Sequence, residues 1–363
     1  MMQNLIRAGV LTLVAMLAAL AAPSASSQPQ APLKIGFVYV SPIGEAGWTY
    51  QHDLGRRAME AALGDRVKTT MVESVAEGPD SERVLRDLAA QGNSLIFATS
   101  FGYLEAALRV AAEFPNVRFE HAGGYKTAAN LNTYNARYYE ARYLAGLLAG
   151  KTSRSGIAGY VAAFPVPEVV QGINAFAIGL REANPQAQLR VLWLNSWFDP
   201  PRERDAALSL INQGADVLTN HSGSPAVALA AQEKGVKLIA YQSDMRKLAP
   251  DAQLAAVTHE WAGYYTGVAR AVLAGTWKAQ PVWGGMKDGL VALSGFSPGI
   301  PGDVRALIES RRKAIEAGSF KPFSAPLRDN QGQTRLARGA LDDAQIAGMD
   351  WLAQGVVGTL PKP

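Results

Sequence analysis

The chain has 363 residues, of which 48% are hydrophobic and 18% charged, so it has enough apolar material for about two or three domains. Its formal net charge of +4 is small and dispersed, without a block of lysine and arginine, which argues against nucleic-acid binding. It contains no cysteine, so the sequence excludes disulfide bonds and a lipid anchor on a cysteine.

The N-terminal segment has the pattern of a secretory signal peptide. Arg7 supplies a positive charge, residues 8–22 form a short apolar stretch, and small residues follow at 23–27. We therefore expect residues 1–27 to be removed, leaving a mature protein outside the cytoplasmic membrane and without stable membrane insertion. The apolar stretch is shorter than the roughly 20 residues of a membrane-spanning helix, and a retained anchor is the alternative.

From Lys34 onward, short apolar runs alternate with amphipathic stretches. In the first half this pattern predicts helices at residues 50–63, 81–91 and 103–114 between strands at 35–40, 67–72, 94–98 and 117–121. Such a βαβ order predicts a parallel sheet with right-handed crossovers.

The pattern restarts after a long helix that we predict at residues 137–151. Strands are expected at 157–162, 189–194, 216–219 and 236–241, with helices at 166–183, 202–213 and 226–234 between them. Later segments (strands at 254–258 and 290–294, helices at 260–274 and 302–317) are expected to cross back between two lobes. The N-terminal lobe would comprise residues 33–135 with part of 255–300, and the C-terminal lobe 136–254 with part of 290–325. The tail, residues 326–363, has one expected helix at 342–354 and is assigned to neither lobe.

Aromatic and polar residues follow the predicted strands of both halves. In open α/β sheets, ligands bind outside the carboxyl ends of the strands, so two facing sets of ends would form one small-molecule cleft. Each residue alone also fits a structural role, as a core aromatic, a hydrogen-bonded histidine or a turn cap. The candidates are Trp48 and Tyr50 near the first strand, Ser100, Phe101 and His121 after later strands, and Phe164, Trp197, His221 and Asp244 in the second half.

Catalytic and metal-binding motifs are incomplete. Gly295-Phe-Ser-Pro-Gly299 has the spacing of a hydrolase nucleophile elbow, but Pro298 lacks the backbone N–H that the oxyanion needs. His259-Glu260 lacks the second histidine of the zinc motif H-E-x-x-H, and the other histidines are scattered. The sequence therefore predicts no catalytic residue, no metal and no cofactor.

Several longer stretches carry a resemblance to a known family. They include the opening KIGFVYVSPIGEAGWTYQHDLGRRAMEAALG, Tyr138-Tyr-Glu-Ala-Arg-Tyr-Leu-Ala-Gly146, Ser196-Trp-Phe-Asp-Pro200 and Gln242-Ser-Asp244, in order between Lys34 and Phe323. The chain resembles the basic membrane protein family, the purine nucleoside receptor-like substrate-binding proteins of ABC transporters. The resemblance implies a type I periplasmic-binding fold: two Rossmann-like lobes with parallel sheets, joined by a three-segment hinge. It further implies a periplasmic protein, expected to be monomeric, with a purine ligand and an ABC permease as partners.

The resemblance also implies roles for four residues. Trp48 and Trp197 match the aromatics that stack on the base from the two lobes, Asp244 matches a carboxylate that holds the ligand, and Lys287 lies near a site lysine. The first loop lacks an aspartate typical of nucleoside-binding members, Tyr50 adds bulk there, and His121 stands where an acid is common. Because ribose hydroxyls would lose acceptors, we expect a free nucleobase, with adenine first. The alternatives are a purine nucleoside, a sugar, or an enzyme acting on a nucleobase.

Overall fold

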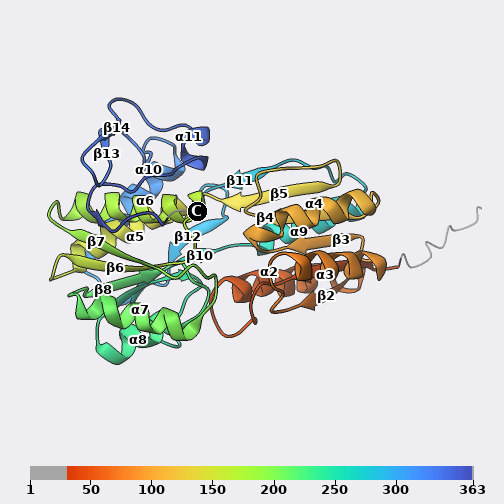
Figure 1. The fold of residues 1–363 in the computed structure, drawn as a ribbon, viewed down its shortest axis with the longest axis horizontal. Helices are drawn as coiled ribbons and strands as arrows, with labels where there is room; N and C mark the ends of the chain where they lie inside the picture. Colours follow the sequence, from red (N-terminus) through yellow and green to blue (C-terminus); the bar gives the residue numbers. More distant parts are fainter. Residues whose placement is uncertain (1–30, 362–363) are drawn as a thin grey trace, which may run out of the picture. The chain divides into compact units, whose positions relative to one another are not determined.

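Two mostly parallel β-sheets, each covered by helices on both faces, organise the computed structural model, which describes residues 31–361 (Figure 1). The expected signal peptide lies outside these described residues. From Leu33 onward the chain forms one unit in which the sheets belong to two lobes. This arrangement confirms the predicted two-lobed α/β fold.

The N-terminal lobe contains a six-stranded sheet with every strand pair parallel. Ile35 and Phe37 of the first strand point to one face of the sheet and Val38 points to the other, each into a different hydrophobic cluster. This alternation buries both faces of the strand, as its continuous apolar run predicts. The sheet consists of β11 (Val282–Gly284), β5 (Leu131–Ala136), β4 (Arg118–Ala122), β3 (Leu95–Ala98), β1 (Leu33–Val38) and β2 (Val67–Val72) in that order, with helices α2 (Trp48–Leu63), α3 (Pro79–Ala90), α4 (Leu104–Glu113) and α9 (Ala262–Leu273).

The C-terminal lobe contains a seven-stranded sheet in which one edge strand, β12, runs antiparallel to its neighbour. Its strands are, in spatial order, β12 (Val291–Ser294), β10 (Gln253–His259), β9 (Lys237–Gln242), β8 (Val217–Asn220), β6 (Ile157–Ala162), β7 (Gln188–Trp193) and β15 (Val356–Val357). Its helices are α5 (Tyr138–Thr152), α6 (Pro167–Ala183), α7 (Pro200–Asn212), α8 (Ala226–Lys234) and α10 (Gly302–Glu316).

The chain passes between the lobes three times. The first passage joins β5 to α5 at Arg137, the second joins β10 to α9, and the third joins β11 to β12. At the first passage the Arg137 backbone N–H donates to the Gly284 carbonyl, at 2.7 Å, so the first and third passages lie side by side. A hinge of this kind lets two rigid lobes rotate around a ligand between them.

Helices α5 and α6 pack closely because glycines face the contact. A Cβ atom at Gly146 of α5 would overlap the Phe176 carbonyl, and one at Gly179 of α6 would overlap the Tyr143 carbonyl. Backbone therefore meets backbone, which fixes α6 firmly on α5. This matters for the site because the first turn of α6 reaches the cleft between the lobes.

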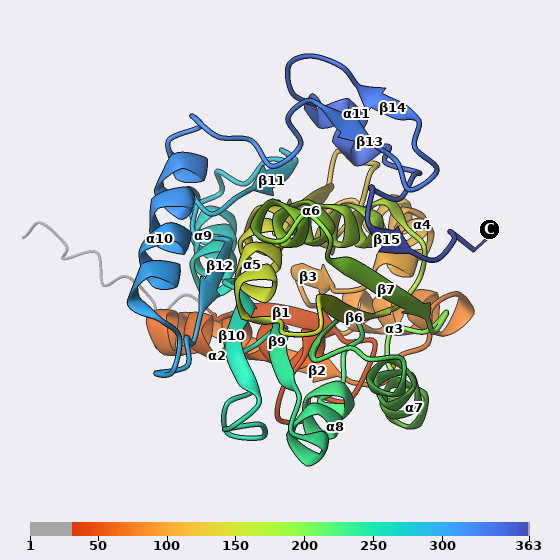
Figure 2. The same ribbon diagram turned by 90° about the vertical axis from the view of Figure 1, so that its left-hand side faces the viewer.

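The tail packs on the C-terminal lobe, through β13 (Leu327–Arg328), β14 (Thr334–Leu336), α11 (Asp343–Ala347) and β15. β15 pairs with β7 (Figure 2). The Asn174 amide of α6 donates to the Trp351 carbonyl of the tail at 2.7 Å. The expected helix over 342–354 is wrong in length. Asp342 and Gln345 form a capping box that starts the helix, but it ends after Ala347 so that the chain can extend into β15.

Candidate ligand-binding site

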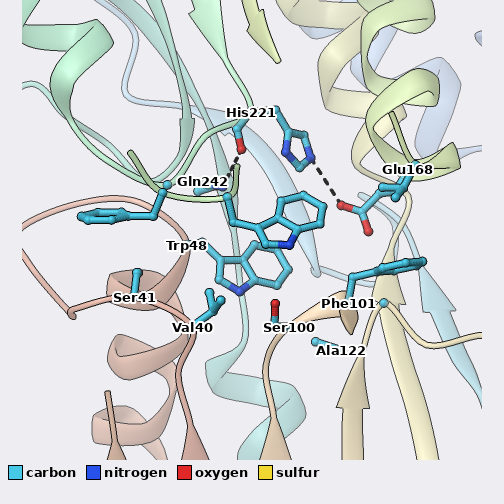
Figure 3. Close-up of a pocket in the computed structure, with 14 residues that line it drawn as sticks. Val40, Ser41, Trp48, Ser100, Phe101, Ala122, Glu168, His221 and Gln242 are labelled. Carbon is cyan, nitrogen blue, oxygen red and sulfur yellow. Dashed lines mark hydrogen bonds and ion pairs between the residues drawn. The ribbon is translucent and has the colours of Figure 1, made fainter. Parts of the chain in front are cut away.

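A cavity opens between the lobes at the carboxyl ends of the strands, with empty space of about 530 Å³, part of it open to solvent. Both lobes line it (Figure 3), with aromatic rings and a few polar groups, the composition that is typical of a small-molecule site. The N-terminal lobe contributes Val40, Ser41, Trp48, Ser100, Phe101, Ala122 and Gly123, and the C-terminal lobe contributes Val166, Glu168, Trp197, Phe198, His221, Gly223 and Gln242.

Trp48 is the first residue of α2, so this helix begins two residues before the predicted start at residue 50. Gly47 before it adopts φ 98°, which a glycine tolerates and which turns the chain into the helix. The Trp48 indole N–H donates to the Thr99 carbonyl of the same lobe at 2.7 Å. This N–H therefore has its partner within the lobe, and the ring itself lines the cavity.

Trp197 comes from the loop between β7 and α7 of the other lobe. Its indole N–H donates across the cleft to the Glu77 carboxylate, with 3.0 Å between Nε1 and Oε1. Phe164 packs against the ring of Trp197, with ring centroids 4.8 Å apart. The cavity therefore has one tryptophan from each lobe, and both rings are oriented by hydrogen bonds to protein atoms.

Glu168 is the acidic residue of the cavity. It lies in the first turn of α6, where the helix dipole favours a carboxylate. Its Oε2 accepts a hydrogen bond from the Asn135 amide of the other lobe at 3.1 Å, and its Oε1 lies 3.5 Å from His221 Nε2. Burial lowers the pKa of His221, which favours the neutral imidazole. Glu168 thus brings a carboxylate next to a neutral ring that can donate one hydrogen bond.

Gln242 adds an acceptor to the same side of the cavity. Its amide N–H donates to the His221 carbonyl at 3.2 Å, whereas its buried Oε1 has no hydrogen-bond partner among the described residues. The backbone of Gln242 has φ 72°, an uncommon conformation for a residue with a side chain. Backbone strain of this kind is concentrated at functional sites, where the fold maintains it.

The lobes touch at the rim of the cavity. The Gly47 N–H donates to the Ser243 hydroxyl of the other lobe at 2.8 Å. A Cβ atom at Gly47 would overlap the carbonyl oxygen of Gly223, which lies on the C-terminal lobe. The structure therefore describes the two lobes closed on one another.

Comparison with known proteins identifies the family. The sequence profile described as Bmp, ABC transporter substrate-binding protein PnrA-like, matches residues 33–318, most of the chain. The chain belongs to the Bmp family. A purine-binding protein of Brucella abortus (strain 2308) is 50% identical over 331 residues, which cover 91% of this chain and 94% of that protein. The family indicated by the sequence motifs is thus confirmed.

One further relative and one solved structure are similar to this Bmp-family protein. A putative ABC transporter glucose-binding protein of Haloferax volcanii is 39% identical over 326 residues, 90% of this chain and 81% of that protein. A solved structure, an ABC transporter solute-binding protein from Aeropyrum pernix K1, has a TM-score of 0.69 at 17% identity and covers 84% of this chain and 95% of its own. At that identity the likeness concerns the fold alone.

Membership in the Bmp family has direct consequences. These are substrate-binding proteins of ABC transporters rather than enzymes. The protein therefore has a ligand and a permease as partners, and it acts outside the cytoplasm. In the part of the chain that the structure describes, no helix is long and apolar enough to cross a membrane. The same residues contain no cluster of histidine, aspartate and glutamate that could hold a metal ion.

Of the residues singled out in the sequence, the structure brings five to the cavity of the Bmp-family protein. Trp48, Ser100 and Phe101 line it from one lobe, and Trp197 and His221 from the other. Phe164 stands behind Trp197 rather than in the lining. These six residues lie near the cavity, as the rule that ligands bind at strand ends predicts, and their contact with a ligand stays a prediction.

The other four lie outside the cavity lining. Tyr50 is two residues beyond Trp48 on α2, about 200° around the helix, so it points elsewhere. His121 is fully buried inside β4, and burial lowers its pKa to about 3. Asp244 accepts from the Arg246 N–H and the Gln253 amide, the turn-capping alternative considered for it. Lys287 is exposed in the third passage between the lobes.

Sequence reasoning missed Glu168 as a site residue. It follows Phe164, which lies just after the strand β6, and it is the second residue of α6, after Pro167. A carboxylate in the first turn after a buried strand is the signal that could have identified it. Asp244, two residues beyond the cavity residue Gln242, was chosen instead as a strand-end residue and because of the family resemblance.

Proposed function

We propose that this protein captures a purine base, with adenine as first choice, in the cavity between its lobes and delivers it to an ABC permease from the periplasm. The base would stack between the rings of Trp48 and Trp197. The observation that carries the proposal is the combination of two such rings, one from each lobe, with acceptor groups at their edge. The 50% identical Brucella abortus relative, described as purine-binding, supports it.

Adenine fits the polar groups of the cavity. It presents an exocyclic amine and a ring N–H, and both are donors. The Glu168 carboxylate only accepts hydrogen bonds, and the Gln242 side-chain oxygen is a second acceptor without a partner among the described residues. An oxopurine in the same orientation would present a carbonyl oxygen in place of the amine, opposite the Glu168 carboxylate, which cannot donate a hydrogen bond.

The free base is favoured over the nucleoside. Attaching ribose replaces a ring N–H with a bulky group whose hydroxyls need partners. On the first loop, Ser41 is the hydroxyl at the cavity, and its oxygen already contacts the Thr49 hydroxyl at 2.7 Å. Unpaired buried polar groups cost about 1–3 kcal/mol each, so we expect adenine to bind at least about tenfold more tightly than adenosine.

Calorimetric titration with both ligands tests this preference. Tighter binding of adenine supports the proposal, whereas equal or tighter binding of adenosine overturns the free-base assignment and leaves the family untouched. A hexose is the second candidate, because the 39% identical Haloferax volcanii relative is described as glucose-binding and aromatic rings also stack on sugars. A thermal-shift panel of adenine, adenosine and glucose separates the three, since a ligand of the native state raises its stability by RT ln(1 + [L]/Kd).

The proposed mode of action is a monomer that closes by hinge motion. Small-angle scattering with and without the tightest ligand of the panel measures it. A smaller radius of gyration under saturating ligand is expected, and an unchanged radius counts against closure.

A further inference from the structure

Glu77 lies outside the cavity lining, on the loop between β2 and α3 of the N-terminal lobe, and it is exposed. One of its carboxylate oxygens, Oε1, accepts three hydrogen bonds. The donors are the Ser100 hydroxyl at 2.7 Å, the Gly102 backbone N–H at 2.8 Å, and the Trp197 indole N–H at 3.0 Å. The first two belong to the same lobe as Glu77, and the third comes from the opposite lobe.

We propose that Glu77 is a positioning residue that couples closure of the lobes to the orientation of the Trp197 ring. Within the N-terminal lobe, Ser100 and Gly102 hold the carboxylate in place before closure. When the lobes meet, the carboxylate accepts a hydrogen bond from the Trp197 N–H and fixes the orientation of the Trp197 ring at the cavity. The inference rests on the proposed function only in that a ligand stacks on Trp197, and it does not depend on which ligand that is.

The local geometry supports a dedicated acceptor. A Cβ atom at position 102 would overlap the Glu77 carboxyl group, so Gly102 leaves the space that the carboxylate occupies. Among residues 31–361, no lysine, arginine or histidine forms an ion pair with Glu77. Hydrogen bonds from neutral donors are therefore its described partners, and bonds to an ionised acceptor are stronger than neutral ones.

The kinetic consequence follows from when the bond forms. The Trp197–Glu77 bond joins the two lobes, so it is made after the ligand has entered and must break before the ligand leaves. Loss of the carboxylate should therefore raise the dissociation rate and leave the association rate unchanged. A hydrogen bond to a charged group contributes about 1.5–3 kcal/mol, and taking the lower end for an exposed carboxylate gives about a tenfold faster dissociation for Glu77→Ala.

A double-mutant cycle with Trp197→Phe is the decisive measurement, because phenylalanine keeps a ring and removes the N–H. Stopped-flow kinetics would follow adenine binding to the wild type, Glu77→Ala, Trp197→Phe and the double variant. We expect Glu77→Ala to accelerate dissociation about tenfold in the wild type and less than about threefold in the Trp197→Phe protein. An equal effect in both backgrounds, or none, overturns the coupling.

Glu77→Gln and Glu45→Ala complete the set. The glutamine retains an acceptor oxygen without the charge, so its dissociation rate should lie between those of the wild type and Glu77→Ala. Glu45 is an exposed acid of the same lobe, on the first loop, with no side-chain hydrogen bond or ion pair in the described part of the chain. Glu45→Ala should therefore leave both rates unchanged, and a similar acceleration there would assign the effect to net charge and overturn the role of Glu77.

The choice of probe separates this inference from the proposed function. If adenine does not bind, the purine-base proposal fails, and the same cycle is run with adenosine or glucose. If none of the three binds, scattering of the ligand-free proteins decides. A larger radius of gyration for Glu77→Ala than for the wild type supports the cross-lobe bond, and an identical radius overturns it.

Discussion

The two tryptophans of the cavity are anchored in different ways. Trp48 begins a helix, donates its N–H to Thr99 of its own lobe, and packs edge-on against His52 with ring centroids 4.4 Å apart. Trp197 lies in a loop and donates its N–H to Glu77 of the opposite lobe. The hydrogen bond of the Trp48 ring therefore forms within a single lobe, whereas the Trp197 ring acquires its hydrogen bond when the lobes close.

Removing the Trp48 ring should have the largest effect on ligand binding. Stacking of a base on an aromatic ring contributes about 1–3 kcal/mol, so Trp48→Ala should weaken adenine binding about 10- to 100-fold, as measured by calorimetric titration. An unchanged affinity would mean that the Trp48 ring serves packing alone.

Trp197→Ala is the matched variant that sharpens the comparison. It should also weaken binding, but the two variants should differ in stability without ligand. Trp48 covers the fully buried His52 of its own lobe, whereas Trp197 packs on the half-buried Phe164. Trp48→Ala should therefore lower the unfolding temperature more than Trp197→Ala does. Thermal unfolding of the ligand-free proteins measures the two unfolding temperatures. A lower temperature for Trp197→Ala than for Trp48→Ala would contradict the view that Trp48 is the ring anchored within one lobe.

Blocking closure should have the next largest effect. The Cβ of Gly47→Ala would overlap the Gly223 carbonyl of the opposite lobe and hold the lobes apart. Overpacking costs about 1–3 kcal/mol, so we expect adenine affinity to fall about tenfold or more in calorimetric titration.

Gly44→Ala is the control for the closure variant. Gly44 has φ 59° on the same loop, so alanine strains the backbone there as well, yet nothing lies within 4 Å of its added Cβ. Its affinity for adenine should stay close to that of the wild type. Equal losses in both variants would attribute the effect of Gly47→Ala to loop strain rather than to closure.

Neutralising the acid of the cavity should have a smaller effect. Glu168→Gln keeps the size of the side chain but replaces a charged acceptor by a neutral amide, a difference of about 1 kcal/mol, or about fivefold in adenine affinity. Because the amide can also donate, the preference for adenine over the oxopurine hypoxanthine should decrease. Competition titration with the two bases measures the ratio of adenine affinity to hypoxanthine affinity. An unchanged ratio would exclude Glu168 as the group that accepts a hydrogen bond from the amine.

The sequence predicted the fold in considerable detail because its strands are apolar and its helices amphipathic. The strand expected at 157–162 is β6, and the helix expected at 226–234 is α8. The strand β5, LNTYNA, was missed because its polar residues hide its burial, although Asn132 and Thr133 are buried. β15 was missed because two residues carry no periodicity, and their pairing with β7 is a tertiary contact.

The site was less predictable than the fold. The strand-end rule gives a neighbourhood, and Trp48, Ser100 and Trp197 were found in this way. The rule does not give the direction of a side chain, and one step along a strand reverses it, so His121 points into the core while the next residue, Ala122, lines the cavity. Contacts such as that between Trp197 and Glu77 join residues far apart in sequence and depend on how the lobes meet.

The smallest expected effect concerns Asp244, which the family resemblance assigned to the ligand. Its Oδ1 accepts the Arg246 N–H at 2.9 Å and the Gln253 amide at 2.7 Å, and its side chain is 44% exposed and outside the cavity lining. Asparagine retains an oxygen for these two donors. An exposed interaction of this kind contributes at most about 1 kcal/mol to stability, and without a ligand contact Asp244→Asn should change adenine affinity less than about twofold. Calorimetric titration beside Glu168→Gln gives the comparison directly. A loss larger than that of Glu168→Gln would mean that Asp244 turns toward the ligand when it binds, and would return the carboxylate role to the position that the sequence motif first indicated.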